Sequence, residues 1–264
     1  MGNLTTAATV LCVDIGNSST HCGIWSAETA RELENLPLTA PASALLELAA
    51  RAGVDGIAWC SVVPALADAL RTAFETAPVP VVEVDYRCAP GLPVTYANPS
   101  EIGPDRLANA IGAQALHGLP ALIVDLGTAT TVSVVRRDDG YVGGMIGPGL
   151  RLMTDYLHER TARLPRLDAQ SVVTFEPRAG QPGGTTTEAM LLGCHHGYRG
   201  LVLALLTEAR SMIPPGEGQP SVIITGGASE MLRGLPDGDT WHFHPRLTFH
   251  GLGHAWTRFC TTSP

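Results

Sequence analysis

Hydrophobic residues along this chain fall into short runs separated by polar turns, a pattern typical of strands that alternate with helices. The first half opens with an apolar run at Val10–Val13. After a short polar turn, more strand-like sequence follows at His21–Trp25. The later runs of this half predict helices at Ala44–Ala52, Pro64–Phe74 and Leu107–Leu116, and strands at Gly56–Val63 and Val79–Val84.

The second half repeats this mixture. Its apolar runs predict strands at Ala121–Val124, Val132–Val135, Tyr141–Ile146 and Ser221–Thr225, and helices at Leu150–Arg160 and Glu188–Arg210. Strands and helices in both halves indicate an α/β fold with two similar domains and a cleft between them. The boundary is expected near Gly118-Leu119-Pro120, which gives an N-terminal domain at 1–118 and a C-terminal domain at 119–264.

An internal repeat of one short motif is the most informative feature of the sequence. The segments D-I-G-N-S-S-T, from Asp14, and D-L-G-T-A-T-T, from Asp125, share the pattern D-x-G-x-[S/A]-[S/T]-T at a domain-scale spacing. Each segment follows an apolar run and precedes more strand-like residues, so each is expected to be the turn of a β-hairpin. Lysine-bearing phosphate loops and dinucleotide-binding loops lead from a strand into a helix instead.

The two turns carry groups that suit a polyphosphate. Glycine lets the backbone approach an anion closely, and hydroxyls and turn N–H groups supply hydrogen-bond donors. A carboxylate beside a phosphate is repulsive unless a cation lies between them, so Asp14 and Asp125 predict metal-dependent nucleotide binding. Aspartate and glycine also form ordinary tight turns, but a matched pair of turns favours the functional interpretation.

Two further segments are candidates. The buried strand Ser221–Thr225 ends in Gly226 and Gly227, which suits a backbone pressed against a nucleotide base or ribose, and Cys60–Pro64 is its expected counterpart in the first half. A turn then delivers Asp105 and Arg106 to the start of a helix, where anions bind well. The pattern alone fits a second interpretation equally well. In it, the helix dipole favours Asp105 in the first turn, and Arg106 is solvated.

Composition narrows the chemistry. All 17 basic residues are arginine, so the chain lacks the lysine of a P-loop, a Schiff-base enzyme or a protein kinase. The net charge of −8 argues against nucleic acid or anionic lipid as the main partner. Charged residues make up only 16%, which suggests a large core and a subunit interface. Six scattered cysteines fit reduced thiols in the cytoplasm.

Six motifs carry a family resemblance, and they occur in this order: D-I-G-N-S-S-T, Y-x-N-P-x-x-x-G-x-D-R, D-L-G-T-A-T-T, G-G-M-I-G-P-G-L, T-T-x-E-A-M-x-x-G and I-T-G-G. Together, from about Val10 to Gly251, they resemble type III pantothenate kinases of the acetate-and-sugar-kinase/Hsp70/actin superfamily. The resemblance implies two RNase H-like (actin-like ATPase) domains with an interdomain cleft. The first would carry the first phosphate loop and the substrate segment, and the second would carry the second phosphate loop and the adenosine segment.

The same resemblance implies an activity and its partners. It predicts a cytoplasmic homodimer that uses ATP to phosphorylate the primary hydroxyl of pantothenate to 4'-phosphopantothenate, the first step of coenzyme A biosynthesis. Mg²⁺ and a monovalent cation, K⁺ or NH₄⁺, are the implied cofactors. Nucleic acid and membranes are not expected as partners.

Roles follow by matching positions. Asp105 matches the catalytic base, Asp14 would hold Mg²⁺ through water, and Asp125 would bind the monovalent cation. The positions that match ATP-binding residues are Asp14, Ile15, Gly16, Asn17, Ser18, Ser19, Thr20, His21, Thr128, Gly226 and Gly227. The positions that match pantothenate-binding residues are Tyr96, Gly103, Pro104, Asp105, Arg106 and Thr186.

Three positions depart from the family pattern. Pro104 stands where a small residue is common, Ser18 replaces a threonine, and Thr185 replaces an asparagine that often precedes the substrate threonine. Proline fixes one backbone angle but leaves the next residue in place, so Asp105 keeps its expected position.

The expected mechanism follows from phosphoryl transfer itself. The transition state is loose, so catalysis consists mainly of positioning and charge neutralisation, with Asp105 orienting the hydroxyl and accepting its proton late. Two rival functions are a non-catalytic regulatory accessory protein on the same fold and another small-molecule kinase of the superfamily. The intact acidic residues oppose the first rival, and the Y-x-N-P…G-x-D-R segment opposes the second.

Overall fold

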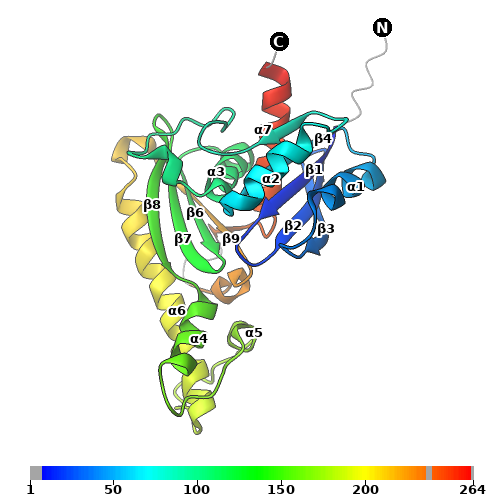
Figure 1. Cartoon of the computed structure of the whole chain (residues 1–264). Helices are drawn as coiled ribbons and strands as arrows, with labels where there is room; N and C mark the ends of the chain where they lie inside the picture. The colour runs from blue at the N-terminus through cyan, green and yellow to red at the C-terminus, as the bar shows by residue number, and fades with distance from the viewer. Residues whose placement is uncertain (1–7, 236–239, 263–264) are drawn as a thin grey trace. The chain divides into compact units, whose positions relative to one another are not determined.

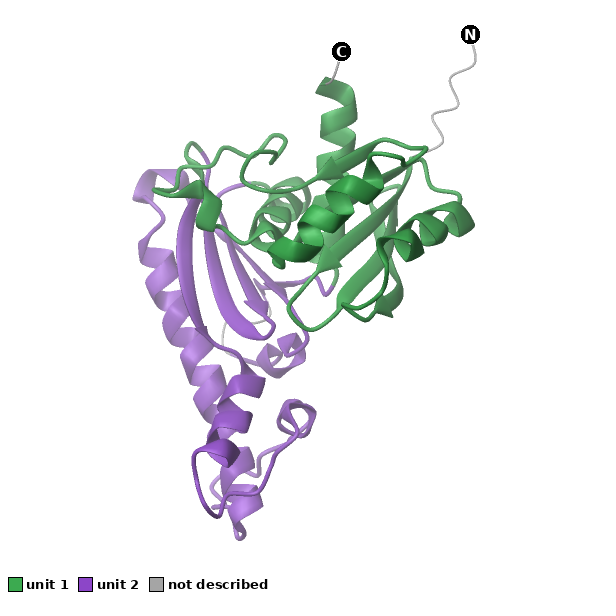
Figure 2. Cartoon of the chain, in the orientation of Figure 1, with its two compact units in different colours: residues 1–118, 138–141, 246–264 green, residues 119–137, 142–245 purple. Residues whose placement is uncertain are grey.

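The computed structural model describes residues 8–235 and 240–262 (Figure 1). The chain forms two compact units, and each contains one five-stranded sheet (Figure 2). Unit 1 comprises Met1–Gly118, Asp138–Tyr141 and Arg246–Pro264, and unit 2 comprises Leu119–Arg137 and Val142–Pro245. The segments Asp138–Tyr141 and Arg246–Pro264, which we expected in the second domain, therefore belong with unit 1, and the helix of the latter packs on the unit 1 sheet.

The sheet of unit 1 has the strand order β3-β2-β1-β4-β5. Strand β2 pairs antiparallel with β1 and with β3, whereas β4 runs parallel to both β1 and β5. The strands are β1 (Thr9–Ile15), β2 (Thr20–Ser26), β3 (Thr29–Leu36), β4 (Gly56–Ser61) and β5 (Val81–Glu83).

Helices cover both faces of this sheet. Alternate residues of β1 face opposite ways. Leu11, Val13 and Ile15 join the apolar cluster under α1 (Ala42–Ala52) and α2 (Pro64–Phe74). The other face packs against α7 (Leu247–Thr262), which in turn packs against α3 (Pro104–His117). The 3₁₀ helix η1 (Pro99–Glu101) precedes α3.

Close contacts between α3, α7 and the sheet depend on glycine. An added Cβ at Gly251 of α7 would lie 1.8 Å from the carbonyl oxygen of Ala108 in α3. A Cβ at Gly56 of β4 would overlap the indole of Trp256 at 2.1 Å. These distances leave no room for a side chain, so the glycines allow α7 to fill this layer.

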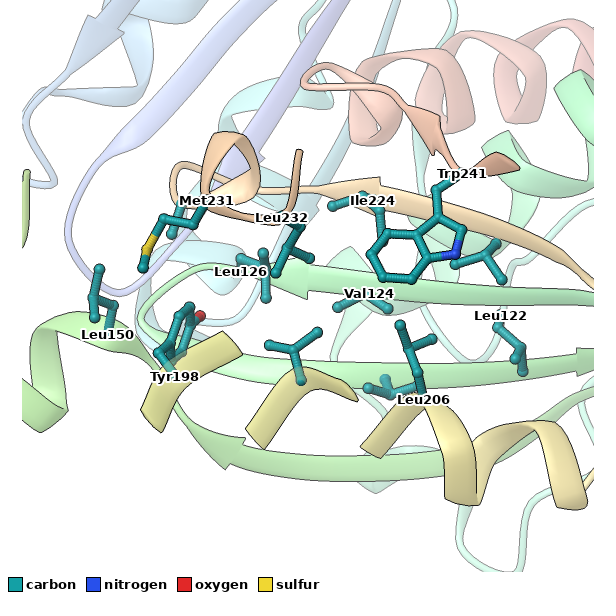
Figure 3. Packing of buried hydrophobic residues seen from close by; sticks show 14 of the residues in the cluster. Leu122, Val124, Leu126, Leu150, Tyr198, Leu206, Ile224, Met231, Leu232 and Trp241 are labelled. Atoms are coloured by element: carbon teal, nitrogen blue, oxygen red, sulfur yellow. The ribbon is translucent and has the colours of Figure 1, made fainter. Parts of the chain in front are cut away.

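The sheet of unit 2 has the order β10-β9-β6-β7-β8. Its strands are β6 (Ala121–Leu126), β7 (Ala129–Arg136), β8 (Gly140–Pro148), β9 (Ser221–Thr225) and β10 (His242–Phe243). One face carries α6 (Thr186–Ser211), and apolar residues of β6, β7 and α6 form a cluster with Leu232 and Trp241 (Figure 3). The remaining helices of this unit are α4 (Leu150–Glu159), α5 (Ala169–Val173), η2 (Pro215–Glu217) and η3 (Ser229–Leu232).

The two sheets share one topology. In each, an antiparallel hairpin (β1–β2 or β6–β7) is followed across the sheet by a parallel partner of its first strand (β4 or β9). The D-x-G segments form the turns of the two hairpins, which confirms the strand–turn–strand prediction. The expected counterparts lie on the equivalent strands of the two sheets: Cys60–Pro64 starts near the end of β4, and Ser221–Gly227 consists of β9 and the two glycines after it.

Most of the predicted elements are confirmed, and α2 and β9 have their predicted bounds. The elements that the sequence did not predict are strands β3 and β10, helices α5 and α7, and the short 3₁₀ helices. Strand β3 has a mostly polar sequence at the edge of its sheet, with five of its eight residues exposed. Such a strand lacks the apolar signal on which the prediction relied.

Candidate active site

Asp14 lies near the end of β1, on the face of the unit 1 sheet that α3 and α7 cover. Its neighbours Val13 and Ile15 point to the opposite, apolar face. On the same side as Asp14, the Cys12 thiol donates to the carbonyl oxygen of Phe249 in α7, at 3.3 Å. Strand alternation therefore directs Asp14 toward the helices that carry the other candidate residues.

Asp105 occupies the first turn of α3, where Gly103 is the N-cap and Pro104 the first helical residue. Its Oδ1 accepts a hydrogen bond from the backbone N–H of Arg106 at 2.8 Å. Burial raises the pKa of Asp105, while that hydrogen bond and the charge of Arg106 act in the opposite direction.

The two carboxylates influence each other. Burial, and then the negative charge of Asp105, raise the pKa of Asp14 to about 7. Bringing two partly buried carboxylates close together is unfavourable unless a proton or a cation compensates the charge. Carboxylates whose pKa values are raised in this way are found more often at functional sites than in structural turns.

Cys60 is a neighbour of Asp14 to which the sequence analysis assigned no role. It pairs with Asp14 across β1 and β4, and its thiol donates to Asp14 Oδ1 at 3.5 Å. Burial raises the pKa of Cys60 well above its usual range, so the sulfur keeps its proton and acts as a donor. The C-S-V-V-P segment marked this strand end, but only the pairing register identifies the contact.

Arg106 is not solvated, contrary to one of the two interpretations left open by its sequence. Its side chain is buried, and the guanidinium carbon lies 5.6 Å from the ring centroid of Tyr141. Tyr96 packs edge-on against the same ring with the centroids 6.2 Å apart. The Tyr96 segment is held there because Thr95 N–H donates to the Tyr141 carbonyl at 2.9 Å. Unit 1 thus brings Tyr96 and Arg106 together through a residue that the sequence analysis did not select.

The first hairpin turn is closed by its own hydrogen bonds. Gly16 N–H donates to the carbonyl of Ser19 at 3.0 Å, and the Ser19 hydroxyl lies 3.0 Å from Nε2 of His21. Asn17 and Ser18 at the tip are exposed. Ser19 and His21 therefore shape the turn, and Asn17 and Ser18 present their side chains to solvent.

The second hairpin turn lies against the end of β9 in unit 2. Gly226 has φ +90°, and an added Cβ would be 2.5 Å from the backbone nitrogen of Leu126 and 2.7 Å from Asp125 Oδ1. Thr128 and Gly227 are exposed. Unit 2 therefore brings Gly226 directly beside Asp125, with Thr128 at the tip of the hairpin.

Thr186, the first residue of α6, lies away from this hairpin. The helix begins with a capping box in which Glu188 N–H donates to the Thr185 hydroxyl at 3.2 Å and Thr185 N–H donates to Glu188 Oε2 at 3.1 Å. Thr186 is exposed and precedes Tyr198, which contacts the hairpin, by roughly 18 Å of helix at ~1.5 Å per residue. Figure 2 shows that the first turns of α6 extend past the end of the sheet of unit 2.

Similar folds occur in solved structures. A Campylobacter jejuni protein assigned to the Baf family of transcriptional activators aligns with 95% of this chain and 99% of its own, at a TM-score of 0.57 and 18% identity. The activator of the 2-hydroxyisocaproyl-CoA dehydratase from Clostridium difficile, solved with bound ADPNP, aligns with 97% and 98%, at a TM-score of 0.54 and 11% identity. These likenesses and the two matching sheets define the fold class, two RNase H-like domains of the actin-like type.

The sequence relatives identify the family within that class. A type III pantothenate kinase from Akkermansia muciniphila is 37% identical over 92% of this chain and 96% of its own length. One from Methylacidiphilum infernorum is 36% identical over 84% and 79%. The family model for type III pantothenate kinase matches residues 10–208. The chain belongs to the type III pantothenate kinase family, as its motifs predicted, and is a kinase that phosphorylates pantothenate in coenzyme A biosynthesis with ATP as co-substrate.

Proposed function

We propose that Asp105 is the general base of the phosphoryl transfer from ATP to the primary hydroxyl of pantothenate. The observation that carries this assignment is the pair of partly buried carboxylates, Asp14 and Asp105, in which burial raises the pKa of both. Asp105 orients the substrate hydroxyl and accepts its proton late, when the bond to phosphorus is largely formed.

The test is Asp105→Asn, which keeps the shape of the side chain and removes its negative charge. ADP release with ATP and pantothenate should fall by roughly 100-fold or more, because positioned bases contribute about 10²–10⁴. Calorimetry should give an unchanged dissociation constant for a nonhydrolysable ATP analogue. Asp68→Asn on the exposed face of α2 is the control and should keep its activity. A near-normal kcat for Asp105→Asn would contradict the base assignment.

We further propose that Asp14 holds Mg²⁺ through water and that Asp125 binds K⁺ or NH₄⁺. The donor chemistry fits, because Mg²⁺ usually keeps several waters and binds one or two carboxylates together with substrate phosphates. The raised pKa of Asp14 supports this assignment, since a cation would relieve the repulsion from Asp105. The cations would neutralise charge on the transferring phosphoryl group. In a chain without lysine, the cations held by these carboxylates, together with the hairpin N–H and hydroxyl donors, would take the place of an ammonium side chain.

Contacts to the substrates complete the proposed site. The first hairpin, from Asp14 to His21, and Thr128 in the second would bind the phosphates of ATP through backbone N–H groups and exposed hydroxyls. Gly226 and Gly227 would lie along adenosine. Tyr96, Gly103, Pro104, Arg106 and Thr186 would contact pantothenate, where the Arg106 guanidinium suits a carboxylate because it offers two parallel donors.

We also propose that the enzyme is a cytoplasmic homodimer that associates through unit 2. Leu152 and Tyr156 on α4 are 48% and 63% exposed, and Ile146 on β8 is 67% exposed. Residues of α4 and α6 line a largely apolar cavity of about 870 Å³ between these helices. Exposed apolar surface of this kind is typical of an interface. The exposed start of α6, with Thr186, lies at the same cavity, so a dimer would bring it close to the second subunit.

Helix α6 itself is long and apolar enough to cross a membrane by length and composition, and 33% of its most apolar window is buried. Its buried residues pack on the unit 2 sheet, which supports a role in the fold and at a subunit interface.

Leu152→Glu should yield monomers in light-scattering measurements, and Tyr86→Glu, at an exposed tyrosine of unit 1, should leave the dimer intact. A Leu152→Glu protein with the mass of a dimer would contradict the proposed interface.

A further inference from the structure

Tyr198 connects the second hairpin to the start of α4. It is fully buried on α6, and its hydroxyl oxygen lies 2.9 Å from the hydroxyl oxygen of Thr130, the first pairing residue after the hairpin turn. The Thr130 hydroxyl is also 2.9 Å from the carbonyl oxygen of Pro148, which lies two residues before α4. Three segments of the chain therefore meet at the Thr130 hydroxyl.

The direction of each hydrogen bond follows from its partners. A carbonyl oxygen can only accept, so the Thr130 hydroxyl donates to Pro148. Its proton is then committed, and Tyr198 must donate to Thr130. The chain of bonds runs from the Tyr198 hydroxyl to the Thr130 hydroxyl, and from the Thr130 hydroxyl to the Pro148 carbonyl. The Thr130 hydroxyl accepts one bond and donates the other.

The backbone next to this chain is packed tightly against the hairpin turn. An added Cβ at Gly149 would lie 2.3 Å from the carbonyl oxygen of Thr128 and 2.4 Å from that of Gly127. The turn that carries Thr128 is thus in direct contact with the β8–α4 junction. The hydroxyl chain and this backbone contact therefore join the same two segments, the hairpin and the β8–α4 junction.

We propose that Tyr198 is a positioning residue for ATP, whose hydroxyl fixes the second hairpin against the start of α4 so that Thr128 and the turn N–H groups are preorganised for the phosphates. The inference rests on the proposed function of this hairpin. Preorganised donors bind more tightly because less conformational freedom is lost on binding. Tyr198 acts from the α6 side of the sheet and does not itself touch the nucleotide site.

The aromatic ring and the hydroxyl have separable roles. The ring lies in the apolar cluster, with Leu150 on one side of it and Leu126 on the other (Figure 3). Phenylalanine at this position would keep that packing and lose only the hydroxyl. Tyr198→Phe therefore removes the connection between the segments without opening a cavity.

The experiment compares Tyr198→Phe with wild type by three readouts: the dissociation constant of a nonhydrolysable ATP analogue, the separate KM values for ATP and pantothenate, and the thermal unfolding midpoint. The analogue should bind roughly 3- to 10-fold more weakly, the factor that one neutral hydrogen bond contributes. KM for ATP should rise by the same factor, and KM for pantothenate should change less than about twofold. Tyr86→Phe, at an exposed tyrosine of unit 1, is the control and should match wild type in all readouts.

A second pair of variants tests the connection itself. Thr130→Ser keeps the hydroxyl and should bind the analogue like wild type, whereas Thr130→Val, which also loses the bond to Pro148, should weaken binding at least as much as Tyr198→Phe. If both side chains act through the bond between them, the double variant Thr130→Val with Tyr198→Phe should bind the analogue hardly less tightly than the single variant with the lower affinity. Additive losses in the double variant would overturn the connection.

Unchanged analogue binding in Tyr198→Phe would overturn the inference, and so would equal rises in both KM values together with a lower unfolding midpoint. The latter result would mark a structural role only. The proposed function fails separately, because analogue binding is measured without turnover. If Asp105→Asn keeps its activity while Tyr198→Phe loses analogue affinity, the base assignment is wrong and the positioning role stands.

Discussion

The two hairpins of this kinase share their strand topology, but they differ in what supports them. In each unit the hairpin turn follows an aspartate, and a parallel strand pairs with that aspartate on the other side: Asp14 pairs with Cys60, and Asp125 with Thr225. The backbone pairing around the two aspartates is therefore the same in both units. The side chains that surround each aspartate are different, and they give the two hairpins different chemical properties.

The turns also differ in length. Asp14 pairs with His21 in the first hairpin, whereas Asp125 pairs with Thr131 in the second, so the second turn is shorter by one residue. The first residue of the returning strand that pairs with the outgoing strand is Thr20 in the first hairpin and Thr130 in the second, and both are buried. An alignment of the two motifs by sequence instead matches Thr20 with Thr131. Pairing register, rather than the shared pattern, identifies the equivalent residues.

The surroundings of these two threonines show the consequence. Thr20 lies at an apolar cavity of about 190 Å³, which Leu36, Leu45 and Leu70 also line. Thr130 instead bonds to Tyr198 and to the Pro148 carbonyl. The base of the first hairpin thus lies beside an apolar cavity, and the base of the second is held by hydrogen bonds.

The largest expected effect concerns the two hairpin aspartates. Asp14→Asn and Asp125→Asn should each lower kcat/KM by roughly 100-fold or more, as the loss of an electrostatic group at a transition state commonly does. The variants should differ in what restores activity. Asp14→Asn should need more Mg²⁺ at an unchanged K⁺ requirement, and Asp125→Asn should need more K⁺ or NH₄⁺ at an unchanged Mg²⁺ requirement. Steady-state rates over both cation series measure this, and identical profiles for the two variants would contradict the division of roles.

A smaller effect is expected at the tight contact of unit 2. Gly226→Ala places a Cβ against Leu126 and Asp125 at a positive φ, so it should lower the free energy of unfolding by about 2 kcal/mol or more. The neighbouring Gly227 has nothing within 4 Å of an added Cβ, so Gly227→Ala is the matched control and should change stability by less than about 0.5 kcal/mol. Urea unfolding measures both variants. Equal stabilities would show that the β9 turn does not hold Asp125 in place.

The last expected effect is the pH dependence of stability without divalent cations. The pKa of Asp14 is about 7 in the folded protein and about 4 in an unfolded chain, so the folded state holds the extra proton between these values. The free energy of unfolding should therefore fall as pH rises through this window, by at most about 1.4 kcal/mol per pH unit from this group. Asp14→Asn removes that contribution, and its stability relative to wild type should increase from pH 5 to pH 8.

Urea unfolding in EDTA at several pH values measures this difference. Asp68→Asn, whose aspartate is exposed on α2, should keep the wild-type pH profile. Parallel profiles for Asp14→Asn and wild type would contradict the view that the ionised Asp14 carboxylate destabilises the folded, cation-free protein.

Much of the fold could be predicted because its signals are local. The apolar runs before Asp14 and Asp125 identify the hairpins, and Pro64 marks the start of α2 where the structure has it. Helix α7 was missed for a physical reason. Gly251 and Gly253 weaken the helical signal of its sequence, yet they are needed where α7 approaches Ala108 and Trp25.

The candidate site divides in the same way. The repeated motif of the two D-x-G turns could be recognised without a structure, because it consists of residues that are adjacent in the sequence. The proximity of Asp105 to Asp14 and the stacking of Arg106 on Tyr141 depend on tertiary packing. Tyr198 carried no signal at all, since a buried tyrosine that bonds to a hairpin has the same sequence pattern as any core tyrosine of a helix.

The most direct test of the account is a crystal structure of the enzyme with a nonhydrolysable ATP analogue, pantothenate, Mg²⁺ and Tl⁺, whose anomalous signal marks monovalent sites. We expect the phosphates to contact both hairpins, a hydrated Mg²⁺ beside Asp14, Tl⁺ bound by Asp125, and the pantothenate hydroxyl within hydrogen-bond distance of Asp105. A nucleotide bound away from either hairpin, or cations that avoid both aspartates, would contradict it.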